Sequence, residues 1–276
     1  MSQFTTRFAP SPTGLLHRGH AFSALTAHEA ARAAGGRFLL RIEDIDATRC
    51  RPQFEAAILE DLAWLELTWE TPVRRQSEHL ADYHDALDRL RARGLTYRCF
   101  KTRKEILDDI GRAPHDPAEA YVGAPLSAAE EAQLLAEGRP YAWRLSLAAA
   151  RVALGGFEGL DFVEDGRGRI QARPETAGDV VLARKDVGVA YHLAVVVDDA
   201  LQQVTHVIRG EDLAEATHIQ RLLQALLDLP TPVYRHHPLL RGPHGRRYAK
   251  RDQAETLRDL RWRGVTPEAL RAELGV

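Results

Sequence analysis

The stretch TTRFAPSPTGLLHRGH at residues 5–20 constrains the fold more than any other part of the chain. Thr5–Phe8 predict a short strand, and the proline- and glycine-rich run APSPTG after it predicts a tight turn. From Leu15 to Ala34 the residues favour a helix, which the two glycines at 35 and 36 end. A strand, a tight turn and a helix are therefore expected in immediate succession.

Two histidines, His17 and His20, fall on the first turn of this helix and share one face. Free backbone N–H groups and the helix dipole make a helix start an anion site, so phosphate is a candidate ligand. Two surface histidines after a turn are the simpler interpretation, and the pair alone favours it. The surrounding sequence has to decide between the two.

Length and composition set broad limits. A chain of 276 residues with 45% hydrophobic and 28% charged residues fits one large or two soluble globular domains. No apolar run approaches the ~20 residues of a membrane span, and the N-terminus has no signal-peptide core. The two cysteines, Cys50 and Cys99, suggest no disulfide scaffold and fit the cytoplasm. With a net charge of −2, any nucleic acid must contact a local basic surface.

A second strand is expected at Phe38–Ile42 and would complete a βαβ unit with the first strand and helix. Ligands of such folds bind at the carboxyl ends of the strands. Glu43, Asp44 and Asp46 follow that end directly. This acidic cluster could hold an amino group or a metal-bound phosphate, or it could simply cap a helix and be solvated.

Residues 1–100 are expected to form the first half of the α/β fold, and the rest of the chain divides into three parts. Residues 101–178 are richer in prolines and loosely patterned, which predicts an inserted α+β subdomain, and α/β patterning resumes at 179–240. The expected helices are Pro52–Leu65, Ser77–Arg93, Thr102–Ile110, Ser127–Gly138, Thr217–Leu227, Gln253–Arg263 and Pro267–Leu274. The expected strands are Tyr97–Phe100, Tyr141–Leu147, Asp161–Glu164, Arg169–Ala172, Asp179–Ala183, Ala190–Val197 and Val204–Ile208.

Arg209 lies at the carboxyl end of the last of these strands and is again in a ligand position. On local evidence alone, an ion pair with Glu211 or Asp212 is the favoured explanation of Arg209. A core aromatic with a satisfied hydroxyl is likewise the favoured explanation of Tyr191. In the final part, 241–276, a basic loop contains Lys250, one of only four lysines. A compact ammonium suits phosphate oxygens, so both a phosphate contact and a solvated basic loop are open for this lysine.

Five strings, RFAPSPTG with HRGH, RIEDID, YHLAVVVDD, THVIRGED and RRYAKRD, occur in the order found in class I aminoacyl-tRNA synthetases. The chain resembles the glutamyl branch of that family, with HRGH as its HIGH element and RRYAKRD as its KMSKS element. The resemblance implies an α/β, Rossmann-like nucleotide-binding fold with an inserted α+β subdomain and a short C-terminal helical segment. It also implies activation of L-glutamate by ATP with Mg²⁺.

The resemblance assigns the site residues in two groups. His17, Gly19, His20 and Lys250 would bind ATP, with the histidines and the lysine acting on its phosphates. The glutamate-binding residues would be Arg7, Ala9, Ser11, Glu43, Tyr191 and Arg209. Glu43 would hold the α-ammonium, and the two arginines the carboxylates. The sequence does not decide which arginine holds which carboxylate; we favour Arg7 for the side chain.

Two departures from the family pattern matter. In the KMSKS-like loop the first lysine is Arg247 and the serine is Ala249, which removes one hydroxyl donor. Short relatives often have a zinc site of the form CxC…YxxxC, but Lys101 and Pro125 replace two of its cysteines here. One thiol and one tyrosine do not make a tetrahedral zinc site, so we predict that zinc is absent.

The chain ends soon after the KMSKS-like loop, where a full glutamyl-tRNA synthetase continues into an anticodon-binding region. This resembles the glutamyl-queuosine tRNA(Asp) synthetases, which attach glutamate to queuosine in the anticodon of tRNA(Asp). The expected partners are L-glutamate, ATP and queuosine-containing tRNA(Asp), for a cytoplasmic monomer without membrane contact. The alternatives are a glutamyl-tRNA synthetase that charges tRNA(Glu), a small HxGH nucleotidylyltransferase and a non-catalytic RNA-binding paralogue.

Overall fold

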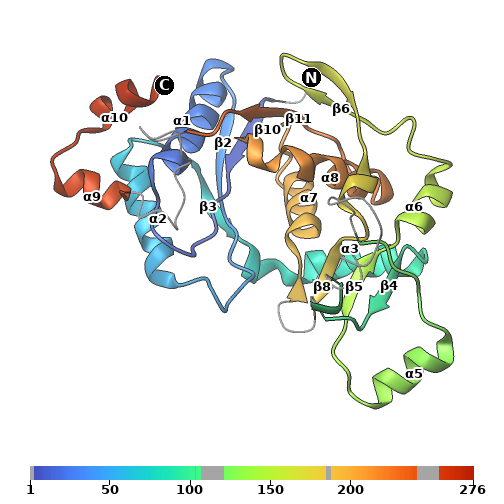
Figure 1. Ribbon diagram of the computed structural model, residues 1–276. Helices are drawn as coiled ribbons and strands as arrows, with labels where there is room; N and C mark the ends of the chain where they lie inside the picture. Colours follow the sequence, from blue (N-terminus) through green and yellow to red (C-terminus); the bar gives the residue numbers. More distant parts are fainter. Residues whose placement is uncertain (1–2, 103, 107–120, 185–187, 241–254) are drawn as a thin grey trace.

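The computed structural model describes residues 3–102, 104–106, 121–184, 188–240 and 255–276 (Figure 1). The basic loop with Lys250, Arg247 and Ala249, and most of the helix predicted at Thr102–Ile110, lie outside these ranges. Among the described helices, none combines the length and apolarity needed to cross a bilayer.

The first half of the nucleotide-binding fold forms as the sequence predicts. Strand β1 (Thr5–Phe8) leads through the turn into α1 (Arg18–Ala33), which returns to β2 (Arg37–Ile42), parallel to β1. Strand β3 (Glu70–Arg75), which was not predicted, pairs in parallel with β2. Around this sheet lie α2 (Pro52–Trp64), the short 3₁₀ helix η1 (Gln76–His79) and α3 (Leu80–Ala92).

The second half places β10 (His206–Gly210) beside β1. Thr5 N donates to Thr205 Oγ1 at 2.8 Å, and Thr205 N donates to Thr5 O at 2.9 Å. Strand β10 pairs in parallel with β11 (Val233–His237) in a four-stranded sheet, β10-β11-β6-β7, which meets the three-stranded sheet β3-β2-β1 where β10 lies beside β1. The order reverses between β1 and β10, and in doubly wound sheets such a reversal opens a crevice at the carboxyl ends of the strands. Arg7 and Arg209 both lie at that crevice.

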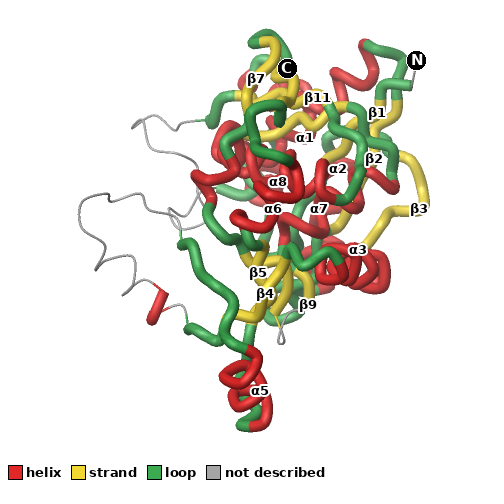
Figure 2. Tube along the Cα trace, turned by 90° about the vertical axis from the view of Figure 1, so that its right-hand side faces the viewer, coloured by secondary structure: helices red, strands yellow, loops and turns green. Residues whose placement is uncertain are grey.

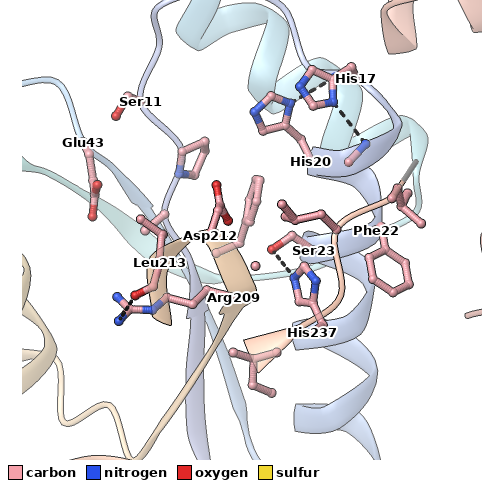
Figure 3. A pocket seen from close by; sticks show the side chains of 18 of the residues that line it. Ser11, His17, His20, Phe22, Ser23, Glu43, Arg209, Asp212, Leu213 and His237 are labelled. Atoms are coloured by element: carbon pink, nitrogen blue, oxygen red, sulfur yellow. Dashed lines mark hydrogen bonds between the residues drawn. The ribbon is translucent and has the colours of Figure 1, made fainter. Parts of the chain in front are cut away.

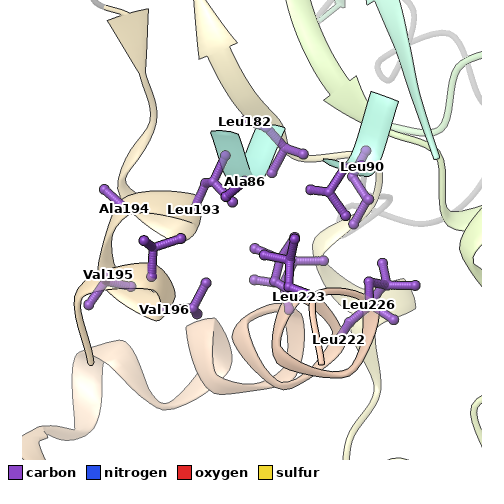
Figure 4. Packing of buried hydrophobic residues seen from close by; sticks show 14 of the residues in the cluster. Ala86, Leu90, Leu182, Leu193, Ala194, Val195, Val196, Leu222, Leu223 and Leu226 are labelled. Carbon is purple, nitrogen blue, oxygen red and sulfur yellow. The ribbon is translucent and has the colours of Figure 1, made fainter. Parts of the chain in front are cut away.

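The predicted strand Ala190–Val197 is wrong, because these residues form the helix α7 (Tyr191–Leu201). Residues 193–199 are all buried, largely against α3 and α8 (Ala214–Leu226), so the valine run does not show the helical periodicity that would have revealed it. Figure 4 shows Leu193, Val196 and Leu223 meeting in this core. As a consequence, Asp198 and Asp199 lie on a buried helix and not at a strand end.

A separate antiparallel sheet forms the inserted part. Its order is β4 (Thr96–Cys99), β5 (Ala142–Leu145), β8 (Val181–Arg184) and β9 (Gly188–Val189). The sheet therefore takes strands from both sides of the predicted bounds at 100 and 178. The hairpin β6 (Asp161–Glu164) and β7 (Gly168–Gln171), expected in the insertion, instead extends the nucleotide-binding sheet through β11. The domain bounds themselves stay predictions.

Helices α5 (Ala128–Ala136) and α6 (Leu147–Leu154) and the 3₁₀ turn η2 (Pro174–Ala177) complete the inserted region. Helix α5 projects from the body of the molecule in Figure 2. The short 3₁₀ turn η3 (Glu211–Leu213) leads from β10 into α8. Two short helices, α9 (Leu257–Trp262) and α10 (Pro267–Leu274), form where terminal helices were predicted. They pack with α1 and α2 in one apolar cluster (Figure 1).

Candidate active site

A cavity of about 590 Å³ opens at the crevice between β1, β10 and the start of α1 (Figure 3). Every described residue that the sequence assigned to the site lines this cavity: Arg7, Ala9, Ser11, His17, Gly19, His20, Glu43, Tyr191 and Arg209. Lys250 lies outside the described residues, and its role stays a prediction. Residues as far apart in the chain as Arg7 and Arg209 thus meet in one place.

His17 and His20 are fixed by the backbone of the helix start. Nδ1 of His17 accepts from Gly19 N at 3.1 Å, and Nδ1 of His20 accepts from His17 N at 3.2 Å. Because Nδ1 is an acceptor in both rings, each neutral ring carries its proton on Nε2. A Cβ on residue 19 would lie 3.0 Å from His17 Cε1, so a glycine lets the ring fold over the turn. Both rings are therefore held as N–H donors at an anion-binding helix start.

Arg7 is buried and already has a carboxylate partner. Its Nε lies 3.1 Å from Asp199 Oδ1, and Arg41 Nη1 lies 2.7 Å from the same oxygen. Arg41 also reaches Glu43 Oε1 at 3.1 Å. Burial alone would raise the pKa of Asp199, but Arg7 and Arg41 outweigh it and hold that pKa below its usual value. Asp199 and Arg41 thus fix the positions of Arg7 and Glu43 from beneath the cavity.

The pKa of Glu43 is shifted in the opposite direction from that of Asp199. Burial raises the pKa of its carboxyl, against the opposing pull of Arg41 and Arg7. A cation arriving from the cavity would offset that desolvation and favour the carboxylate. Glu43 is thus suited to an ammonium ligand.

Asp198 is the second buried carboxylate on α7 and supports the same region. It accepts hydrogen bonds from Arg74 Nε at 2.6 Å, Gln76 Nε2 at 2.7 Å and Tyr83 Oη at 2.8 Å. Sequence reasoning missed this network because its members come from four separate elements. The one available signal was Arg41, an arginine inside the apolar run FLLRI.

Arg209 is also buried, but its described partners are all uncharged groups or a histidine. They are Thr217 Oγ1 at 2.8 Å, Leu213 O at 3.1 Å, His236 Nε2 at 3.2 Å and Tyr191 Oη at 3.4 Å. Neither Glu211 nor Asp212 is among these contacts, so the ion pair considered from the sequence is not found here. A buried guanidinium is costly without an opposite charge, and an anion in the cavity would supply one. Figure 3 shows Arg209 and Glu43 across the cavity from the two histidines.

His192, next to Tyr191, makes stability depend on pH. Burial, helped by Arg209, lowers the pKa of His192 to about 4. The unfolded chain binds this proton near its usual pKa of about 6.5, so the contribution is complete above that pH and is lost as the pH falls towards 4. From pH 7 to pH 5 we expect the free energy of unfolding to fall by about 2 kcal/mol from this group. Urea unfolding of the parent and His192→Gln at pH 7 and pH 5 measures this; equal pH dependence would contradict it.

The region of the family zinc site is held by hydrogen bonds. Tyr97 Oη donates to Asp179 Oδ2 at 2.8 Å, Gly123 N donates to the same atom at 2.9 Å, and Cys99 Sγ lies 3.7 Å from Tyr121 Oη. Within the described ranges, no group of three or more histidine, cysteine, aspartate or glutamate side chains is placed to hold a metal. The absence of zinc stays a prediction, to be checked by metal analysis.

The fold and the cavity match a known class of protein. The family model of the class I tRNA synthetases (E and Q), catalytic domain, matches residues 3–275. A solved glutamate-tRNA synthetase from Elizabethkingia anophelis superposes with a TM-score of 0.76 at 30% identity, over 91% of this chain and 53% of that one. The chain therefore belongs to the class I tRNA synthetases, which are ATP-dependent ligases.

Within that class the relatives point to a particular family. A glutamyl-Q tRNA(Asp) synthetase from Rhodobacter capsulatus is 50% identical over 98% of this chain and 99% of its own length. A second, from Nocardia farcinica, is 46% identical over 97% of this chain and 82% of its own length. Glutamate–tRNA ligase 2 from Dinoroseobacter shibae is 42% identical, but the match spans only 59% of its length. The family is that of the glutamyl-Q tRNA(Asp) synthetases.

Proposed function

We propose that this chain activates L-glutamate with ATP and transfers it to queuosine in the anticodon of tRNA(Asp). One observation supports the activation of glutamate by ATP: a single cavity brings together a buried arginine, an acidic side chain and an anion-binding helix start. The acceptor half rests on the family to which the chain belongs. We further propose that ATP enters as its Mg²⁺ complex and that the protein acts as a cytoplasmic monomer.

Arg209 is the better candidate for the side-chain carboxylate of glutamate. The sequence favoured Arg7, but Arg7 already shares Asp199 with Arg41. Arg209 has no carboxylate among its described contacts, so a bound carboxylate would provide its missing counter-charge. Tyr191 Oη lies beside the same guanidinium and can add a hydrogen bond. Arg7 would then lie beneath the substrate and attract its negative charge. The ion pair with Asp199 holds Arg7 in that position.

Glu43 would receive the α-ammonium of the substrate. Its carboxyl lies on the cavity wall with Ser11, and its burial makes an incoming cation favourable. Glutamate bound between Arg209 and Glu43 would present its α-carboxylate towards the phosphate-binding side of the cavity. Glutamine lacks the anionic side chain and would leave Arg209 uncompensated, which gives a basis for choosing the acid over the amide.

Activation needs positioning and charge stabilisation more than a protein nucleophile. An α-carboxylate oxygen of glutamate attacks the α-phosphorus of ATP, an O–P bond forms, and the bond to the leaving pyrophosphate breaks. His17 and His20, with their Nε2–H groups, would donate to phosphate oxygens as negative charge moves to the leaving group. Lys250 would supply a compact cation from the basic loop.

A glutamyl-tRNA synthetase that charges tRNA(Glu) is the chief alternative, since glutamate–tRNA ligases also match the chain. A charging assay separates the two acceptors. With labelled glutamate and ATP, we expect queuosine-containing tRNA(Asp) to become labelled and tRNA(Glu) to stay unlabelled. Labelling of tRNA(Glu) alone would establish the alternative.

A further inference from the structure

Two side chains behind Arg209, those of His236 and Glu164, have no role in activation as described above. Arg209, on β10, and His236, on β11, are direct neighbours across the two parallel strands. Strand β6 is the next strand of the same sheet, and Glu164 at its end lies in register with Tyr234 of β11. The three side chains therefore come from three consecutive strands, with Arg209 at the cavity and Glu164 buried farthest from it along the sheet.

The hydrogen bonds among these three residues define where the imidazole ring carries its proton. Nε of Arg209 donates to Nε2 of His236 at 3.2 Å, and Nδ1 of His236 lies 2.8 Å from Oε2 of Glu164. An arginine nitrogen can only donate, so Nε2 is the acceptor and the proton of the neutral ring lies on Nδ1. Nδ1–H then donates to Glu164, whose Oε1 accepts from the backbone N of His236 at 2.8 Å. Both oxygens of this carboxylate are thus used to orient one ring.

The ring of His236 separates the carboxylate of Glu164 from the guanidinium of Arg209. The side chains of His236 and Glu164 are only 7% and 5% exposed. Burial and the charge of Arg209 lower the pKa of His236 against the opposing effect of Glu164, so the ring is neutral at pH 7. A neutral ring lets Glu164 hold Arg209 without pairing with it directly. Arg7 differs, because its Nε pairs directly with Asp199 at 3.1 Å.

The partners of Arg209 decide which of its nitrogens can bind a substrate. A guanidinium has five N–H donors. Nε is used by His236, and Nη2 donates to Thr217 Oγ1 at 2.8 Å and to Leu213 O at 3.1 Å. Among the described residues, Nη1 contacts Tyr191 Oη at 3.4 Å, and Tyr191 lines the cavity. Nη1 is therefore the nitrogen best placed for a ligand carboxylate, and turning the guanidinium out of this orientation would break the bond to His236.

We propose that Glu164 and His236 are positioning residues that hold Arg209 in the orientation that receives the side-chain carboxylate of glutamate. The proposal rests on the proposed function and deepens it, because it names the groups that set the choice of glutamate over glutamine. His236 holds Nε of the guanidinium, and Glu164 holds the ring of His236. A guanidinium fixed in this way meets a carboxylate with its charge and geometry matched, whereas the neutral amide of glutamine leaves the buried charge uncompensated.

His236→Phe and His236→Gln test the first contact. Phenylalanine keeps a planar ring beside Tyr234 but has no nitrogen, whereas the amide oxygen of glutamine can accept from Arg209 in place of Nε2. For His236→Phe we expect kcat/KM for glutamate in ATP–pyrophosphate exchange to fall at least about tenfold, the scale of a lost hydrogen bond to a charged group, with KM for ATP within about twofold of the parent. His236→Gln should lose no more than about threefold. The preference for glutamate over glutamine should fall in the same order.

Glu164→Gln tests the second contact and the position of the ring proton. Either orientation of the new amide places its NH₂ group against a donor, Nδ1–H or the backbone N of His236. The ring can relieve the first conflict by moving its proton to Nε2, which then faces Nε–H of Arg209 as donor against donor. We therefore expect kcat/KM for glutamate to fall at least about tenfold, as for His236→Phe, although the substituted side chain lies outside the cavity lining.

A double-mutant cycle with Arg209→Ala separates positioning from a general structural role. If His236 acts through Arg209, adding His236→Phe to Arg209→Ala should lower kcat/KM for glutamate by less than about twofold. His218→Phe is the matched control. His218 is a partly buried histidine on α8, it packs against Phe162 of β6, and it lies outside the cavity lining, so its replacement should leave all of these values unchanged.

Three results would each overturn the positioning role: parent values for His236→Phe, an equal loss for ATP and for glutamate, or a full further loss in the Arg209→Ala background. Urea unfolding shows whether the variants are folded. If His236→Phe does not fold, His236→Gln and Glu164→Gln decide, and equal kcat/KM values for these two variants would overturn the proposal. If the parent shows no glutamate-dependent exchange, the proposed function fails first. An active parent with an unaffected His236→Phe variant removes the positioning role alone.

Discussion

Replacing His20 by alanine is expected to lower glutamate-dependent ATP–pyrophosphate exchange by about 10²–10³-fold, because one preorganised donor to the transition state is lost. The structure supplies the reason for preorganisation: Nδ1 of His20 accepts from His17 N, so the donor on Nε2 needs no rearrangement. Lys250→Ala should have an effect of the same order through the loss of a phosphate contact. Initial rates of exchange at saturating glutamate and ATP measure both.

The histidine prediction has a simple control in His84→Ala. His84 is an exposed histidine on α3 outside the cavity lining, and its removal should leave exchange unchanged. Circular dichroism should show the same helix content in all three variants. A loss of less than threefold for His20→Ala, in a folded protein, would remove the role given to this residue.

Replacing Arg209 by alanine should lower kcat/KM for glutamate by about 10²–10³-fold, since a buried, charge-assisted pair with the substrate carboxylate is lost. Because the change removes contacts to the amino acid and not to the nucleotide, KM for ATP should change little. Arg209→Lys keeps the charge but not the planar fork, so it should recover only part of the loss. Exchange rates over a range of glutamate concentrations give these values.

Stability measurements distinguish the two arginines of the cavity. Arg7→Met leaves the buried Asp199 with Arg41 as its remaining ionic partner and should lower the free energy of unfolding. Arg209→Met removes a buried charge with no described carboxylate partner, so it should cost much less stability while lowering kcat/KM for glutamate by about 10²–10³-fold. The reverse pattern, with Arg209 important for stability and Arg7 for glutamate affinity, would favour Arg7 as the residue that binds the side-chain carboxylate.

The family resemblance assigned the candidate site residues, and several of them follow strand ends. Arg209 comes at the end of β10, Glu43 directly follows β2, and the two histidines follow a turn whose prolines and glycine define it. These patterns are local in the sequence, and the parallel strands then bring the residues together at the carboxyl edge of the sheet. Gly19 lies between the two histidines at the same helix start.

What the sequence could not show depends on contacts between distant elements. The valine run of α7 looked like a strand because residues 193–199 are all buried and do not show the helical period. Asp199 consequently seemed to end a strand, whereas it pairs with Arg41, 158 residues away. The hairpin of β6 and β7 likewise joins β11 through a pairing that no local pattern announces.

The most direct test of the proposed function supplies the protein with labelled glutamate, ATP and total tRNA from cells that make queuosine or cannot make it. We expect label in tRNA(Asp) from the queuosine-containing preparation and none above background in the other. The ester should survive removal of the 3′-terminal adenosine, because the glutamate is expected on the anticodon base. Equal labelling of the two preparations, or label released with the terminal adenosine, would contradict transfer to queuosine.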